Sequence, residues 1–219
     1  MVRRTKLETE QTRRTILSAA RATFLQRGMT GTTLEHVAGA AGVSRGAIYW
    51  HFENKKALFD AMRSEVCVPT LDRTDVTTLV AGVDGDDPLG AVERFITAML
   101  AEVTSCVETR QTFEIMAFKC EYVAEFEKEL DLHRIKSGEI RDVLAGVYRR
   151  ARSAGVLRDE VTPKIAATST LVFVMGLMRL WLLDSGAVLV RPSVKALIAA
   201  HVNGLRKPST MRKARPRTN

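Results

Sequence analysis

Apolar side chains recur along this chain at intervals of three and four residues, the spacing of helices with one buried face. No segment shows the sustained alternation of a β-strand, and no internal repeat is visible. The spacing predicts helices over 8–27, 33–41, 45–52, 55–67, 89–107, 109–124, 126–154, 163–183 and 193–204. We therefore expect an all-α protein of about nine helices.

The segment from residue 32 to residue 56 contains two short helices joined by a tight turn. Thr32 and Glu35 have the spacing of a capping box at the start of the first helix. Gly42 can adopt the left-handed conformation that ends this helix, and Ser44 can cap the next one. This order of elements predicts a helix-turn-helix.

The second short helix has outward positions that suit contact with DNA. Tyr49 and Trp50 are about 100° apart on a helix, so a small bundle would not bury both. Hydroxyl, indole and cationic groups bind phosphates, and we expect Arg45 to read bases. The alternative is a surface hairpin with one packed aromatic ring. The predicted DNA-binding residues are Thr33, Ser44, Arg45, Gly46, Tyr49, Trp50, His51 and Lys55.

Basic side chains are concentrated at the two ends of the chain. The 219 residues include 33 Lys and Arg against 25 Asp and Glu, a net charge of +8. Residues 1–63 carry 11 basic and five acidic side chains, and residues 205–219 carry six basic and no acidic ones. Only part of the chain is therefore expected to face a polyanion. The N-terminal arm with Arg3, Arg4 and Lys6 could follow the phosphate backbone or could be a solvated terminus; the same two interpretations apply to the tail.

Changes in composition divide the chain into three parts. Asn54 is expected to cap the helix that follows the helix-turn-helix, and residues 74–88 interrupt the helical pattern with turn-forming residues. We expect a DNA-binding domain over 1–65, a ligand-binding and dimerisation domain over 66–205, and a disordered basic tail over 206–219.

The ionisable side chains do not form the spacing of a catalytic or metal site. The four histidines lie far apart in the sequence, at His36, His51, His133 and His201. Glu121, Glu125 and Glu129 are four residues apart; this spacing can mimic a metal site, but we interpret the three as a solvated helix face. No catalytic residue, metal ion or cofactor is therefore expected.

Two further features bear on the compartment. The cysteines (Cys67, Cys106 and Cys120) are odd in number and lack metal-ligand spacing, which is typical of a reduced cytoplasmic protein; a thiol redox switch is the alternative. The N-terminus does not have the pattern of a signal peptide. The longest apolar run, 171–183, is too short to cross a membrane and contains Arg179.

The N-terminal third resembles the DNA-binding domain of the TetR family of bacterial transcriptional repressors. The matching run begins with Thr-Ile-Leu-Ser-Ala-Ala at residue 15, includes Ile-Tyr-Trp-His-Phe at 48–52 and ends with Asn-Lys-Lys-Ala-Leu-Phe at 54–59. Within that family the chain is most similar to the AcrR-like and TtgR-like regulators of multidrug efflux pumps, and the resemblance is looser beyond residue 65. It implies a repressor that binds a palindromic operator as a dimer and is released by a lipophilic small molecule. A regulator of another pathway, an activator and a ligand carrier without sequence-specific DNA binding are the alternatives.

The resemblance also implies an apolar pocket between the segments 89–120 and 163–183. Methionine and phenylalanine in these segments suit a tolerant binding site, although a core residue has the same sequence signature. Arg179 requires a carboxylate such as Glu114, a backbone carbonyl or a ligand, because an unpaired cation among apolar groups is costly. The predicted ligand-binding residues are Phe95, Met99, Val103, Phe113, Met116, Ala117, Cys120, Leu171, Val174, Met175, Met178 and Arg179.

The last two long helices are predicted to form a homodimer by packing as a four-helix bundle. The expected stripes are Ala166, Ala167, Thr170, Leu171 and Val174, then Val194, Leu197, Ile198, His201 and Leu205. Two-fold symmetry would place two recognition helices in successive major grooves of double-stranded DNA. No membrane partner is expected.

Overall fold

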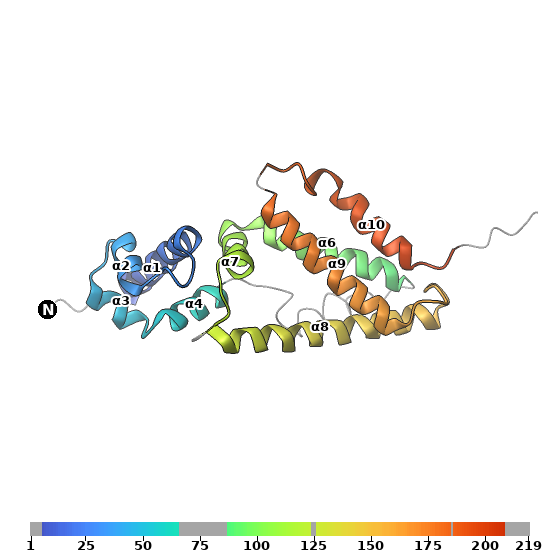
Figure 1. The fold of residues 1–219 in the computed structure, drawn as a ribbon, viewed down its shortest axis with the longest axis horizontal. Coiled ribbons are helices and arrows are strands. Elements are labelled where there is room, and N and C mark those ends of the chain that lie inside the picture. Colours follow the sequence, from blue (N-terminus) through green and yellow to red (C-terminus); the bar gives the residue numbers. More distant parts are fainter. Residues whose placement is uncertain (1–5, 66–86, 124–125, 185, 209–219) are drawn as a thin grey trace, which may run out of the picture.

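The computed structural model describes residues 6–65, 87–123, 126–184 and 186–208 (Figure 1). Within these ranges the chain forms nine α-helices, one short 3₁₀ helix and one isolated β-bridge, so the prediction of an all-α protein is confirmed. The helices are α1 (Lys6–Arg27), α2 (Leu34–Ala41), α3 (Arg45–His51), α4 (Lys55–Ser64), α6 (Pro88–Ser105), α7 (Val107–Phe118), α8 (Glu127–Ser153), α9 (Pro163–Leu183) and α10 (Val194–Leu205), with the 3₁₀ turn η2 (Arg191–Ser193) before the last.

The first four helices form a compact head at one end of an elongated molecule (Figure 1). The apolar stripe of α1, which includes Ile16, Leu17 and Phe24, is fully buried. It belongs to one cluster with residues of α2, α3 and α4, such as Ile48 and Leu58. Burying such a side chain stabilises the fold by about 1.5–3 kcal/mol relative to exposure, so this shared core fixes the orientation of the two short helices.

The core of the head also contains residues from outside its four helices. Ile115 of α7 is fully buried in this cluster, and Phe126, which precedes α8, is 4% exposed there. The ring of Phe126 meets that of Phe59 on α4 edge to face, with the centroids 5.5 Å apart. Figure 1 shows α7 standing between the head and the remaining helices. The core of the head therefore includes residues of α7 and of the segment before α8, while the body has a separate apolar cluster.

The body consists of α6 and α10 packed with the long pair α8 and α9. A chain of polar groups crosses its interior. The Tyr148 hydroxyl lies 2.6 Å from that of Thr170, which lies 2.9 Å from Nε2 of His201. The His201 ring stacks on Phe173 at 4.4 Å between centroids. These contacts join α8, α9 and α10, because each buried polar group finds its partner on the neighbouring helix.

Several helix ends agree with the prediction. Gly28, Gly42 and Gly155 have φ of 72°, 65° and 69°, the left-handed region that glycine enters without a steric penalty. Ser44 caps α3 and Asn54 caps α4, each accepting a backbone N–H with its side-chain oxygen.

Other ends differ from it. The cap of α2 is Thr33, not Thr32, and its capping box uses His36, not Glu35. Thr32 is buried and donates its hydroxyl to the Gly28 carbonyl oxygen instead. The helix predicted to continue toward residue 124 ends at Phe118, because the chain turns there to place Phe126 in the core of the head.

The predicted tail also begins too early at residue 206. Arg206 pairs with Leu157 in the isolated bridge, and the Lys207 amine lies 2.7 Å from Asp159, so both residues belong to the body. The predicted end of the fourth helix at Cys67 and the interruption at 74–86 lie outside the described residues.

Candidate DNA-binding surface and ligand cavity

Helix α3 presents an exposed aromatic and basic face. Its inward side chains anchor it, since Ile48 is fully buried and Phe52, at its C-terminus, is 4% exposed. On the other side Tyr49 is 43% exposed and Trp50 70% exposed. The alternative of a hairpin with one packed aromatic ring is therefore not what the structure shows. This face has the groups and the freedom to enter a major groove.

Glu35 of α2 organises this face. Its carboxylate accepts the Tyr49 hydroxyl at 3.1 Å and lies 3.2 Å from the Arg45 guanidinium. The guanidinium is also 5.7 Å from the centre of the Tyr49 ring. Hydrogen bonds from its own backbone N–H and then from Tyr49 lower the pKa of Glu35, so it is ionised at neutral pH. The sequence did not indicate this role, because Glu35 was assigned to the capping box.

Three predicted DNA contacts lie in different surroundings. The Lys55 ammonium donates to the Met29 carbonyl oxygen at 2.8 Å and lies 5.7 Å from the centre of the Phe126 ring. Thr33 is exposed but serves as the cap of α2, and His51 is half-buried with its ring edge to face against Trp50. Lys55 therefore stands at the junction of head and body, where one of its three N–H donors is already used by Met29.

The body encloses a cavity of about 410 Å³, within the size range of small-molecule sites. Helices α6, α7, α8 and α9 all contribute side chains to its wall. The lining residues are Phe95, Met99, Phe113, Met116, Ala117, Tyr122, His133, Lys136, Ser137, Ile140, Leu144, Leu171, Val174, Met175, Gly176, Met178, Arg179 and Leu182.

Ten of the twelve predicted ligand-binding residues line this cavity. Val103 and Cys120 do not: Val103 is 1% exposed in the core, and Cys120 packs against the core of the head. Burial raises the pKa of the Cys120 thiol to about 11, which makes it a poor redox nucleophile.

No residue of the α8 wall was among the predicted ligand-binding residues. This helix is strongly charged, unlike the apolar segments 89–120 and 163–183 in which the pocket was expected. His133, Ser137, Ile140 and Leu144 recur at the three- and four-residue spacing of one helix face. That spacing is the signal that could have identified the wall.

Of the three partners considered for Arg179, the structure shows a backbone carbonyl. Its guanidinium donates to the Ala117 carbonyl oxygen at 3.1 Å and lies 4.6 Å from the centre of the Phe118 ring. Both contacts are with α7, so Arg179 joins α7 to α9 beside the cavity.

A buried carboxylate joins the body to the head. Glu129, in the first turn of α8, has a side chain only 2% exposed, with the Lys56 ammonium at 2.9 Å and Arg63 on its second oxygen. Hydrogen bonds to Asp60 and then to Glu129 raise the pKa of Lys56. The interpretation as a solvated face is therefore wrong for Glu129. Glu121 precedes α8 and accepts the Thr30 hydroxyl, while Glu125 lies outside the described residues.

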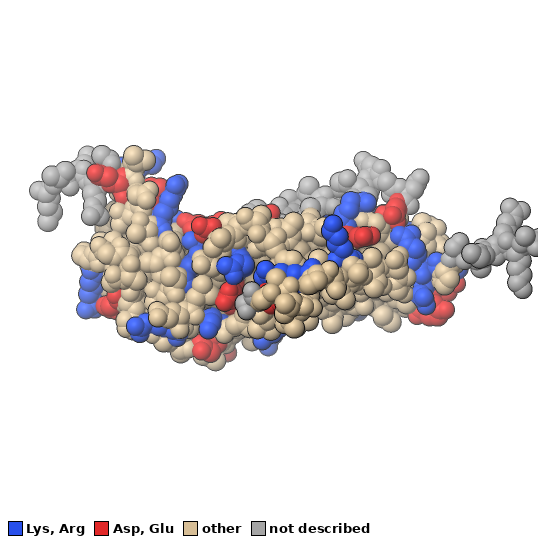
Figure 2. Space-filling model, turned by 90° about the horizontal axis from the view of Figure 1, so that it is seen from above, with Lys and Arg blue, Asp and Glu red and all other residues tan. Residues whose placement is uncertain are grey.

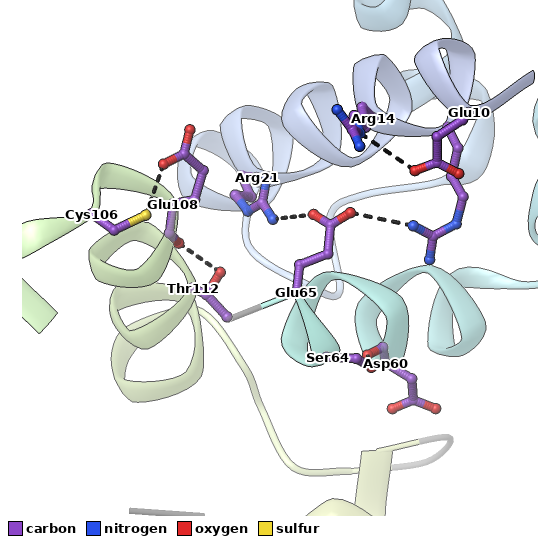
Figure 3. A network of polar contacts seen from close by, with 10 residues as sticks. Glu10, Arg14, Arg21, Asp60, Ser64, Glu65, Cys106, Glu108 and Thr112 are labelled. Atoms are coloured by element: carbon purple, nitrogen blue, oxygen red, sulfur yellow. Dashed lines mark hydrogen bonds and ion pairs between the residues drawn. The ribbon is translucent and has the colours of Figure 1, made fainter. Parts of the chain in front are cut away.

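A second carboxylate holds the end of α4 to α1 (Figure 3). Glu65 receives Arg21 at 2.7 Å on one oxygen and Arg13 at 3.3 Å on the other. The Arg21 side chain is 5% exposed, whereas Glu65 and Arg13 are about one-third exposed. Helix α4 is thus held by Glu65 within the head and by Glu129 from the body.

Helices α9 and α10 carry an apolar outer surface. The stripes predicted for the dimer were largely wrong, because Ala166, Ala167, Thr170, Val174, Ile198 and Leu205 are buried within the protomer. The exposed large apolar side chains are Ile165, Val172, Met175, Leu180 and Leu183 on α9 and Leu197 on α10. Figure 2 shows that much of the body surface seen from the α10 side has no charged side chain.

By length and composition alone α9 could cross a bilayer, although the shorter apolar run considered in the sequence could not. Only 28% of its most apolar window is buried. The helix packs along α8, and its Arg179 donates to the Ala117 carbonyl oxygen of α7.

No group of three or more His, Cys, Asp or Glu side chains that could hold a metal ion occurs in the described part of the chain.

Comparisons with known proteins place this geometry in context. Residues 16–62 match the model of bacterial regulatory proteins of the tetR family, and residues 87–206 match the C-terminal region of MAATS-type transcriptional repressors. The transcriptional regulator TtgR of Pseudomonas putida is 33% identical over 97% of this chain and 100% of its own length.

Two solved structures share the fold. NalD, the secondary repressor of the MexAB-OprM multidrug efflux pump in Pseudomonas aeruginosa, has a TM-score of 0.78 at 27% identity, covering 92% of this chain and 99% of that one. The complex of SmeT with triclosan has a TM-score of 0.70 at 26% identity and covers 94% and 99%. SmeT is the repressor of the Stenotrophomonas maltophilia efflux pump SmeDEF. These relatives are transcriptional regulators.

Proposed function

This chain belongs to the TetR family of bacterial regulatory proteins, and we propose that it is a homodimeric repressor of a multidrug efflux operon. The dimer occupies a palindromic operator in the cytoplasm and leaves it when a lipophilic compound fills the cavity. The similarity of the chain to NalD and SmeT, which are repressors of multidrug efflux pumps, supports the choice of operon.

One observation carries this proposal: α7 belongs to the cavity wall and to the core of the head at the same time. Phe113, Met116 and Ala117 line the cavity, while Ile115 on the same helix is fully buried in the head cluster. A compound that displaces α7 must therefore disturb the packing that orients α3. Packed cores respond to such displacement by small discrete shifts of helices.

Helix α8 supplies a second connection. It contributes His133 to the cavity wall, and Glu129 one turn earlier binds Lys56 and Arg63 of α4. Movement of α8 would be transmitted to α4 through this pair of contacts. The ligand shifts the equilibrium only by its difference in affinity for the two arrangements of the heads.

The apolar outer surface of α9 and α10 is the proposed dimer interface. Exposed residues such as Val172, Leu180 and Leu197 would be covered by the same helices of the partner. An isologous contact of this kind relates the two α3 helices by a two-fold axis, the symmetry that a palindromic operator also has.

The test is fluorescence anisotropy with DNA from upstream of the gene, compared with scrambled DNA at near-physiological salt. We expect tight binding to one DNA only. Arg45→Ala should reduce that preference, whereas Arg149→Ala, an exposed change on α8 outside the head, should leave it intact. Equal binding of the two DNAs by the unmodified protein would contradict sequence-specific repression by this site.

The ligand step has its own variant. Ala117→Phe would fill part of the cavity without altering α3. Because the ring occupies the space that a ligand would fill, release by lipophilic antimicrobials should be lost. Operator binding should either persist or weaken as it does when a ligand displaces α7. Normal release from this variant, with its helical content unchanged, would show that the compounds act elsewhere.

A further inference from the structure

The α8 wall of the cavity differs in chemistry from the other walls. His133, Lys136 and Ser137 follow one another at the spacing of a single helix face, and all three line the cavity. The opposing walls consist mainly of apolar side chains such as Phe95 and Leu171. A ligand would therefore meet one polar strip and otherwise hydrocarbon.

Two members of this strip have no partner among the described residues. The side chains of His133 and Ser137 make no hydrogen bond or ion pair there, and both are partly buried. Burial lowers the pKa of His133, so its ring is neutral at pH 7 and can donate one N–H. A polar group in such a position gains most from a ligand atom that accepts hydrogen bonds.

The third member is a cation held by a nearby carboxylate. The Lys136 ammonium lies 3.1 Å from Glu139, and both side chains are about one-third exposed. Exposed pairs of this kind contribute little, so the ammonium can turn toward an anion in the cavity at small cost.

The charged groups of the cavity wall are all basic. Among the described lining residues Lys136 and Arg179 are charged, and none is Asp or Glu. An ammonium ligand would find like charge and no carboxylate among the lining residues, whereas a carboxylate or phenolate would find donors and a cation. In a site partly shielded from water this difference is larger than at a surface.

We propose that the cavity selects lipophilic weak acids, which place an aromatic body against α6, α7 and α9 and a carboxylate or phenolate against the His133–Lys136–Ser137 strip of α8. The inference rests on the proposed function in one respect, namely that the natural inducer enters this cavity.

The experiment compares three biphenyls of nearly equal size by calorimetry with the full-length protein at pH 7.5, without DNA. They are biphenyl-4-carboxylate, 4-biphenylmethanol and 4-biphenylmethylamine. We expect the acid to bind about tenfold more tightly than the amine, with the alcohol between them, because a charged hydrogen bond contributes about 1.5–3 kcal/mol. Equal or tighter binding of the amine would overturn the proposal.

Three variants locate the effect. Lys136→Met should weaken binding of the acid about tenfold and leave the alcohol unchanged. Glu139→Gln should strengthen binding of the acid, because it removes the carboxylate that competes for Lys136. Arg134→Gln removes an exposed cation from the same helix that does not line the cavity, and should change nothing. If Lys136→Met weakened all three compounds equally, the strip would have no selective role and the proposal would fail.

The proposed function is tested separately by adding the same acid to the protein–operator complex. Selective binding of the acid without release of DNA would sustain the ligand class and reject the release mechanism. Release by the amine alone would reject the ligand class and sustain the repressor.

Discussion

Helix α4 is held at two places by a carboxylate that lies between two cations. The two sites differ in which charge is buried. At Glu65, which joins α4 to α1, the most buried member is a cation, with Arg21 only 5% exposed. At Glu129, which joins α4 to α8, the most buried member is the anion, which is 2% exposed. The first contact is internal to the head, and the second crosses to the body.

This difference determines what each contact can do. Removing an exposed partner leaves the buried charge uncompensated, which lowers the free energy of unfolding. Removing the buried charge itself leaves only exposed charges, and this change is often tolerated. Glu65 joins two helices of the head and therefore stabilises it. In the proposed mechanism α8 shifts relative to the head, so Glu129 would also transmit the state of the cavity.

The largest effect is expected when Glu129 is stranded. The double variant Lys56→Met, Arg63→Met leaves a buried carboxylate without a cation, and the free energy of unfolding should fall by about 3 kcal/mol in urea denaturation. Adding Glu129→Met should recover most of the loss, since the buried charge is then gone. A triple variant no more stable than the double one would show that packing, not charge, is the cause.

Leaving Arg21 without its carboxylate should lower the free energy of unfolding by somewhat less than the loss of both cations at Glu129. Glu65→Ala leaves the buried guanidinium to find water or its neighbours, and we expect a loss of about 2 kcal/mol, with partial recovery on adding Arg21→Met. The same denaturation experiment applies. Operator release by ligand should remain normal in this variant at temperatures where it is folded, because the head-to-body contact at Glu129 is intact.

A milder change separates stability from coupling. Glu129→Gln keeps the shape of the side chain and removes its charge, so stability should fall by only about 1 kcal/mol. The ratio of operator affinities without and with ligand should fall by at least about threefold, as typical couplings amount to only about 1–3 kcal/mol. Glu65→Gln is the matched control. Identical affinity ratios in the two variants would show that Glu129 does not couple the cavity to operator binding.

The pH dependence of the Glu129 contact is smaller still. Because the folded pKa of Lys56 is raised, by Asp60 first and Glu129 second, its stabilising contribution is complete below the unfolded pKa of about 10.4 and is lost as pH rises through the folded pKa. Lys56→Arg keeps the charge throughout this range. Unfolding between pH 8 and pH 11 should therefore show the unmodified protein losing stability relative to Lys56→Arg only at the alkaline end.

The smallest effect is predicted for an exposed pair next to the Glu65 site. Arg14 and Glu10 lie 3.4 Å apart on α1, but their side chains are 69% and 50% exposed (Figure 3). Arg14→Ala should change the free energy of unfolding by less than about 0.5 kcal/mol. A change as large as that of Glu65→Ala would mean that burial does not explain the ranking.

The sequence predicted most of what depends on neighbours along the chain. Gly42, Ser44 and Asn54 ended and began helices as expected, because capping is decided within three or four residues. The error at Thr32 and Thr33 was of one position, since adjacent threonines can both cap and only the buried bond of Thr32 to Gly28 distinguishes them. The exposed pair Tyr49 and Trp50 was predictable because no helix of this size can bury both.

The sequence alone thus determined an all-α chain with a helix-turn-helix and a basic recognition face, since these follow from local periodicity, caps and turn residues. Tertiary structure decided which apolar residues surround a cavity, as with Met175, and which fill a core, as with Val103, because both kinds have the same side-chain chemistry. It also decided that Glu129 is buried against Lys56 and Arg63, which stand more than 60 positions earlier in the chain. Burial and long-range pairing depend on how helices pack, and no local pattern in the sequence encodes that.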